Sequence, residues 1–157
     1  MVKFQEQKII IHFINDMLIY MWTDYIKDIE ALERIYNGKM PSLTDISFHE
    51  FVYSPGRTKH LSLSFITNEL PNPMPSKWKA SGVNSILISI DVVLPVVKYF
   101  GLDMSNYEHL VFDVYAVENQ KIQISIKNSA GNLIIDVEGC SAYIRSWANL
   151  IIGEDEF

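Results

Sequence analysis

Residues 110–138, LVFDVYAVENQKIQISIKNSAGNLIIDVE, predict three antiparallel strands in series, because apolar residues alternate with polar ones and two short loops interrupt the alternation. We pair Val117 with Lys121 across the first loop and Lys127 with Asn132 across the second. This register places only apolar residues on one face of the predicted meander, namely Leu110, Phe112, Val114, Ala116, Ile122, Ile124, Ile126, Leu133, Ile135 and Val137. That face is expected to cover a core.

The opposite face of the predicted meander mixes charged, polar and aromatic side chains, as an antiparallel sheet does where it meets water. An exposed aromatic ring among charges is typical of a binding surface. Tyr115 lies between Asp113 and Asp136 on this face. We therefore predict a partner-binding site that consists of Asp113, Tyr115, Gln123, Asp136 and Glu138.

A β-hairpin is predicted upstream, where ISFHEFVY (residues 46–53) and HLSLSFI (residues 60–66) flank a turn that contains Pro55-Gly56. Pairing Tyr53 with His60 carries Glu50 to the apolar face. Either a register shift or a β-bulge resolves this conflict, or Glu50 is a buried functional acid. Downstream, NSILISIDVV (residues 84–93) predicts a strand that ends near Pro95.

Two helices complete the prediction. Residues 24–37 carry apolar side chains at helical spacing, with Thr23 as the N-cap and Gly38 as the C-cap. Residues 141–153 place Ile144, Trp147, Ala148 and Ile151 at i, i+3, i+4 and i+7. The expected fold class is α+β: a mainly antiparallel sheet, built from a hairpin and a three-stranded meander, with an N-terminal and a C-terminal helix packed on it.

The chain of 157 residues has the length of one domain, which we assign to residues 21–157, and residues 1–20 form an N-terminal extension of uncertain status. Hydrophobic residues make up 48% of the chain, so a packed core is expected. The apolar stretch 9–22 is interrupted by polar residues and is too short to span a bilayer. A single cysteine, Cys140, fits a reducing compartment. We expect a cytoplasmic protein without a membrane partner.

The net charge of −6 arises in the second half of the chain, where residues 81–157 carry four basic and ten acidic side chains. Residues 1–80 carry nine of each. An acidic molecule repels nucleic-acid phosphates and attracts basic proteins. We therefore expect a basic protein partner that docks on an acidic surface, and no nucleic acid.

Catalytic and metal-binding motifs are not recognised in the sequence. His12, His49, His60 and His109 lack metal-ligand spacing, and no phosphate-binding loop or nucleophile elbow occurs. One hydrolytic arrangement can be drawn, with Glu50 orienting His49 across the hairpin from Ser64. A strand histidine is more often structural, and Cys140 reads as a small apolar residue. We expect no enzyme, cofactor or metal.

A family resemblance rests on Trp22, the helix that follows it, Pro41-Ser42-Leu43, and the segment PMPSKW (residues 73–78) that leads to Gly82-Val83-Asn84. In this order of features the chain resembles immunity protein family fifty over residues 21–140. Proteins of that family are encoded beside toxins of bacterial polymorphic toxin systems. The resemblance implies an antidote that binds a cognate toxin domain.

The resulting hypothesis is an immunity protein that neutralises a cognate bacterial toxin through an acidic surface. Two alternatives remain open at this point. One is a secretion-system adaptor or chaperone, and the other is a small hydrolase or ligand-binding domain that uses His49 and Glu50.

Overall fold

The computed structural model describes residues 21–153, so the expected extension 1–20 and the acidic residues 154–156 lie outside the described part. Strands dominate this part of the chain. Its elements are η1 (Trp22–Asp24), β1 (Ile26–Lys27), α2 (Glu30–Ile35), β2 (Ile46–Ser54), β3 (His60–Thr67), α3 (Ser76–Ser81), β4 (Ser85–Val93), β5 (Val96–Phe100), β6 (Leu110–Val117), η2 (Glu118–Gln120), β7 (Lys121–Asn128), β8 (Leu133–Gly139) and β9 (Ser141–Leu150).

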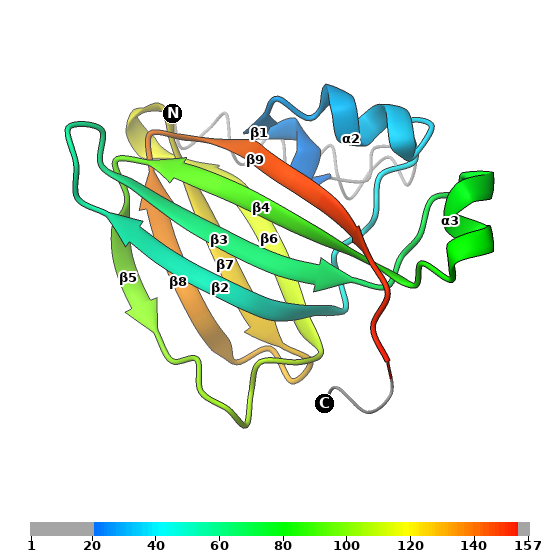
Figure 1. Ribbon diagram of the computed structural model, residues 1–157. Coiled ribbons are helices and arrows are strands. Elements are labelled where there is room, and N and C mark those ends of the chain that lie inside the picture. Colours follow the sequence, from blue (N-terminus) through cyan, green and yellow to red (C-terminus); the bar gives the residue numbers. More distant parts are fainter. Residues whose placement is uncertain (1–20, 154–157) are drawn as a thin grey trace, which may run out of the picture.

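The nine strands form one mixed sheet in the order β1-β9-β4-β3-β2-β6-β7-β8-β5. Only β1 and β9 pair in parallel. The sheet folds over at the junction of β2 and β6, which pair at Ile46 and Leu110 alone. Figure 1 shows the result as two layers, with β9, β4, β3 and β2 in front of β6, β7 and β8. The core lies between these layers.

Alternating residues of both layers fill the core, since side chains on successive strand positions point to opposite faces. Phe112 of β6 lies at its centre, with its ring centroid 4.9 Å from that of Phe65 and 6.2 Å from that of Trp22. The Trp22 indole also donates a hydrogen bond of 2.8 Å to the Pro41 carbonyl, which satisfies its buried N–H. Eight of the ten meander residues expected to cover a core are buried: Leu110, Phe112, Val114, Ile122, Ile124, Ile126, Ile135 and Val137.

The predicted meander is present as β6, β7 and β8. Val117 pairs with Lys121 as expected, but Lys127 pairs with Leu133 instead of Asn132, at a bulge that follows Ile126. Beyond the bulge the register differs from the prediction by two residues, so that Ile126 faces Ile135. A shift of two leaves the side chains from Ile135 onward on their predicted faces. Leu133, which was predicted on the core-facing side, instead pairs with the outward-facing Lys127, and Ile134 is buried at the bulge. The two faces of the meander are therefore confirmed except at Leu133 and Ile134.

The hairpin of β2 and β3 contains the β-bulge that the sequence suggested. Phe48 pairs with Phe65, Glu50 pairs with Ser64, and His49 is the extra residue between them. The bulge turns Glu50 to the outer side of the sheet, where it is exposed. Glu50 is thus not a buried acid.

The expected C-terminal helix is wrong, because Ser141–Leu150 is strand β9, which pairs with β4 along its whole length. Arg145 is an extra residue at a bulge, so Ile144 and Trp147 lie three positions apart and still face the neighbouring residues Ile90 and Ile88. This spacing of three imitates helical periodicity. The expected α+β arrangement, with a helix at each end packed on the sheet, is therefore replaced by a two-layered, nine-stranded sheet with short helices.

The N-terminal helix is shorter than expected. Residues 24–37 contain the end of η1, strand β1 and the six-residue helix α2, which begins after Ile29 and not at Thr23. Leu32 and Tyr36 are buried, and Gly38 has φ +78° where the helix ends. Helix α3 contacts β9 through the rings of Trp78 and Trp147, whose centroids are 5.9 Å apart. In residues 21–153, no helix has the length and apolar character needed to cross a membrane.

Candidate functional site

The outer face of the back layer brings the predicted binding residues together in two cross-strand rows. Antiparallel register places side chains of neighbouring strands opposite one another. The first row runs through β6, β7, β8 and β5 as Tyr115, Gln123, Glu138 and Val96. The second row runs through the same strands as Asp113, Ser125, Asp136 and Tyr99. These eight residues are called the outer face below.

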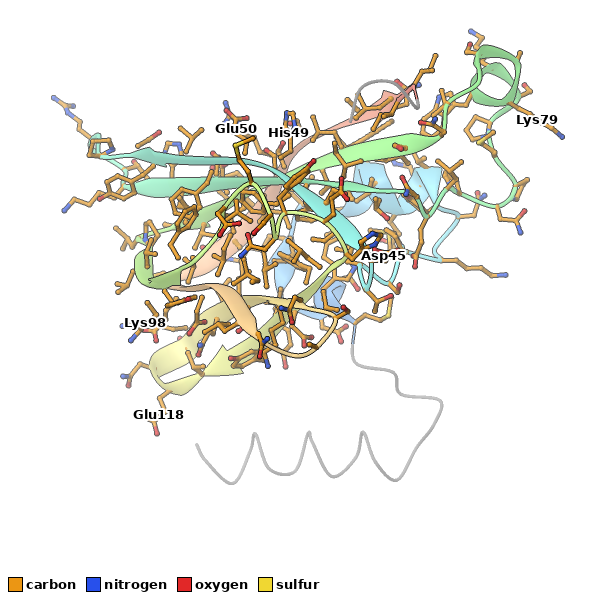
Figure 2. All side chains as sticks on the ribbon, turned by 90° about the horizontal axis from the view of Figure 1, so that it is seen from below. Asp45, His49, Glu50, Lys79, Lys98 and Glu118 are labelled. Carbon is orange, nitrogen blue, oxygen red and sulfur yellow. The ribbon has the colours of Figure 1, made fainter. Side chains whose placement is uncertain are left out.

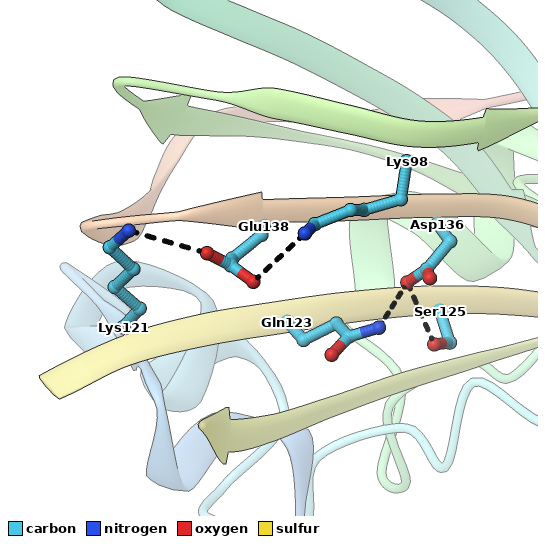
Figure 3. A network of polar contacts seen from close by, with 6 residues as sticks. All are labelled: Lys98, Lys121, Gln123, Ser125, Asp136 and Glu138. Atoms are coloured by element: carbon cyan, nitrogen blue, oxygen red, sulfur yellow. Dashed lines mark hydrogen bonds and ion pairs between the residues drawn. The ribbon is translucent and has the colours of Figure 1, made fainter. Parts of the chain in front are cut away.

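Hydrogen bonds join the middle of the outer face into a network, which Figure 3 shows. The Gln123 amide donates to Asp136 at 2.6 Å, and the Ser125 hydroxyl lies 3.4 Å from the same carboxylate oxygen. The Tyr115 hydroxyl lies 3.1 Å from the Ser125 hydroxyl. These contacts hold Asp136 and the Tyr115 ring in defined positions. Because these side chains are already ordered, they lose less conformational entropy when a partner binds.

Two lysines bracket Glu138 at the side of the network (Figure 3). Its carboxylate oxygens lie 3.4 Å from Lys121 Nζ and 3.7 Å from Lys98 Nζ. The lysine side chains are 42% and 49% exposed, so these ion pairs contribute little to stability. They do neutralise Glu138 locally, and the pair with Lys98 connects the edge strand β5 to this face.

Lysines beside the outer face balance its negative charge. Its carboxylates, on Asp113, Asp136 and Glu138, are equal in number to the lysines beside them, Lys98, Lys121 and Lys127. Partial burial raises the pKa of Asp113, and the positive charge of Lys127 opposes this shift. The acidic excess of the second half of the chain therefore lies elsewhere, including the tail residues 154–156.

Sequence reasoning missed Val96 and Tyr99, which extend the outer face onto β5. They are 51% and 48% exposed, more than Tyr115 at 39%. The available signal was the run VVKYF (residues 96–100), whose β-branched and aromatic residues between Pro95 and Gly101 favour a short strand. The expected strand end near Pro95 was right for β4, which ends at Val93, but a further strand begins directly after the proline.

The hydrolytic arrangement drawn from the sequence is not assembled. His49 and Glu50 point outward from β2, on the opposite side of the molecule from Lys98 (Figure 2). The Ser64 hydroxyl is buried and shares a hydrogen bond of 2.8 Å with the Ser89 hydroxyl. A serine that is held beneath the surface in this way has no access to a substrate.

Cys140, which we interpreted as a small apolar residue, is exposed. It stands between β8 and β9, and its N–H donates a hydrogen bond of 2.9 Å to the Val93 carbonyl. Residues 21–153 contain no group of three or more His, Cys, Asp or Glu side chains placed to hold a metal ion.

A second polar cluster lies on the outer side of the front layer. Asp91 is only 5% exposed, and its carboxylate accepts hydrogen bonds from Ser62 at 2.5 Å and from Tyr143 at 3.2 Å. Arg145 donates to the Ser62 hydroxyl at 3.1 Å. These donors compensate the buried carboxylate, so the cluster has a structural role in joining β3, β4 and β9.

Comparison with known protein families identifies the family of the chain. Residues 28–141 match the family described as immunity protein 50. The chain belongs to the immunity protein 50 family. The match extends over more than half of the chain and includes the predicted binding residues on β6, β7 and β8. The resemblance that rested on residues 73–84 is thereby confirmed. No curated protein and no solved structure was found to match this member of the immunity protein 50 family.

Proposed function

We propose that this member of the immunity protein 50 family binds a cognate bacterial toxin and neutralises it by occupying the toxin's surface, without catalysis. The family match over residues 28–141 carries this proposal. An immunity function requires a specific protein surface, and the outer face offers one with two exposed tyrosines around a fixed polar network. The toxin docks on Asp113, Tyr115, Gln123, Asp136 and Glu138, together with Val96 and Tyr99.

The outer face is suited to recognition by shape and hydrogen bonding more than by charge. Aromatic residues are enriched among interface residues that contribute most to affinity, and Tyr99 and Tyr115 stand at the two ends of the face. A basic toxin remains favoured, since long-range attraction depends on the whole molecule's net charge of −6. At contact, the paired carboxylates and lysines of the face select a partner with both signs of charge.

The test uses the toxin encoded beside this chain's gene. Co-expression is expected to protect cells, and the two proteins are expected to purify as a complex. Tyr99→Ala and Tyr115→Ala are each expected to weaken the complex by about 2 kcal/mol, mainly through faster dissociation. Tyr115→Phe retains the ring and loses only the contact with Ser125, so its effect is expected to be smaller.

The matched control is Ile151→Ser, which removes another exposed apolar side chain, 61% exposed, beyond β9 of the front layer. It is expected to bind like the wild type. If the folded Tyr99→Ala and Tyr115→Ala variants bind and protect like the wild type, the outer face is not the interface. A toxin that neither binds the wild-type chain nor is neutralised by it contradicts the function itself.

A further inference from the structure

Apolar side chains are exposed at the open side of the sandwich, where β2 and β5 approach each other without pairing. The rings of Phe51 and Phe100 lie in contact there, with centroids 4.6 Å apart. Around them are exposed apolar side chains from both layers: Tyr53 (49%), Leu94 (52%), Val97 (42%) and Phe100 (46%). These four residues are called the apolar edge below. Exposed apolar patches of this kind on a folded domain mark interaction sites.

The apolar edge is a continuation of the hydrophobic core. Val97 pairs with Val137 and Phe100 with Ile135, and both of these partners are completely buried between the layers. Tyr53 likewise pairs with the buried Leu61. Residues paired across neighbouring strands share a face of the sheet, so these side chains are on the core-facing side. They remain exposed because β5 is the last strand of the sheet that residues 21–153 form.

Addition of a partner strand to β5 is disfavoured. The strand has only five residues, it contains a bulge between Val97 and Tyr99, and the residue at the bulge is Lys98. Short length, bulges and lysines are the devices by which sheet edges avoid pairing with other chains. A partner must therefore engage the side chains of the apolar edge and not its backbone.

Positive charge surrounds the apolar edge. The segments that form it, residues 51–60 and 94–100, contain Arg57, Lys59 and Lys98 and no acidic residue, and of these cations Lys98 is paired with Glu138 of β8. The backbone of Lys59 lies directly beside Leu94, whose N–H donates a hydrogen bond of 2.9 Å to the Lys59 carbonyl. Figure 2 shows Lys98 at the same end of the molecule as Glu118. In a dimer formed through this edge, the cations of one copy would lie close to those of the other copy. Repulsion between these like charges disfavours such a dimer.

We propose that the apolar edge is a second docking surface, which receives an apolar segment of the toxin flanked by acidic residues. This inference rests on the proposed function and extends it. The apolar side chains of the segment would cover Val97, Leu94 and Phe100 and close the open side of the core. Its carboxylates would meet Arg57 and Lys59, whose charges complement them.

The test measures the affinity and kinetics of the complex with the toxin encoded beside this chain's gene. Leu94→Asn removes an exposed apolar side chain at φ +49°, a backbone conformation that asparagine tolerates better than leucine, so this variant is expected to fold. Combined with Val97→Ser, it is expected to weaken binding about tenfold or more through faster dissociation. Arg57→Glu is expected to slow association, most strongly at low salt.

The matched control is Met104→Ser, which removes an apolar side chain that is 94% exposed outside the apolar edge. It is expected to leave the dissociation constant unchanged. If Leu94→Asn/Val97→Ser and Arg57→Glu both bind the toxin as the wild type does, this inference is wrong. The proposed function would be unaffected by that result. Failure of the wild-type chain to bind the toxin overturns both.

A sedimentation measurement without toxin identifies the competing occupant. The chain is expected to sediment as a monomer at micromolar concentration. If the wild type sediments as a dimer and Leu94→Asn/Val97→Ser sediments as a monomer, the apolar edge binds a second copy of the chain. That result would overturn the inference.

Discussion

Phe112 illustrates how much a single residue contributes to the joining of the layers. It is 2% exposed and its ring packs between those of Phe65 and Trp22. Phe112→Ala removes these contacts and leaves a cavity, so we expect the free energy of unfolding to fall by about 3 to 5 kcal/mol. Chemical denaturation checks this value, with Tyr115→Ala on the exposed face of the same strand as the milder control. A loss under about 1 kcal/mol would contradict the central position of Phe112.

Asp113 provides a prediction on pH dependence. Partial burial raises its pKa in the folded state, although Lys127 opposes the shift. The folded state therefore holds this proton more tightly than the unfolded state, and stability falls as pH rises from the unfolded pKa, about 3.9, to the raised folded value. Asp113→Asn removes the ionisable group. We expect the variant to be slightly more stable than the wild type at neutral pH, by a small amount because the carboxyl is only partly buried.

Denaturation of the wild type and Asp113→Asn across the acidic range measures this effect. The difference in stability is expected to disappear below about pH 4, where the wild-type carboxyl is protonated in both states. Lys127→Gln is the opposing control, because loss of its charge should make the ionised Asp113 more costly. A stability difference that does not change with pH would assign the effect to something other than titration.

At the scale of elements, the passage from β8 to β9 depends on a glycine. Gly139 ends β8, and the following Cys140 N–H donates to the Val93 carbonyl of β4, so the chain crosses from one layer to the other in close contact with β4. A Cβ at position 139 would clash with Val92 Cγ1 and would lie 2.9 Å from the Val93 carbonyl oxygen. Gly139→Ala is therefore expected to lower the free energy of unfolding by about 1 to 3 kcal/mol.

Thermal or chemical denaturation tests the Gly139→Ala prediction. Gly56→Ala is the matched control, since a Cβ added in the β2–β3 turn meets no heavy atom within 4 Å. We expect it to be close to neutral. Equal stabilities of the two variants would mean that β8 and β4 move apart at Gly139 with little loss of stability.

At the scale of the whole molecule, inhibition by binding predicts a defined stoichiometry. Toxin activity should fall linearly as the chain is added and reach its minimum at a fixed molar ratio, independent of incubation time. His49→Ala and Cys140→Ser should retain this end point, because both residues are exposed and neither takes part in the proposed contacts. Time-dependent inactivation by a small fraction of a molar equivalent would instead indicate catalysis.

Local periodicity was sufficient for much of this protein. The meander and the hairpin follow from alternation, because a strand's period of two assigns each side chain to a face before any partner strand is known. Even an error of two residues in the register of β8 left the faces of Ile135, Asp136, Val137 and Glu138 unchanged. The side of the sheet that holds Asp113, Tyr115, Gln123, Asp136 and Glu138 was therefore predictable from the sequence alone.

Tertiary pairing decided the rest. Ser141–Leu150 has an apolar spacing that suits a helix, but it lies between β4 and β1, and a bulge at Arg145 keeps Trp147 on the inner side. The position of strand β5 in the sheet is decided by its partner β8, which brings Lys98 to Glu138 and Tyr99 beside Asp136. The charge and extent of the outer face depend on these contacts between segments distant in sequence. No local pattern encodes them, because strand pairing is a property of the folded chain.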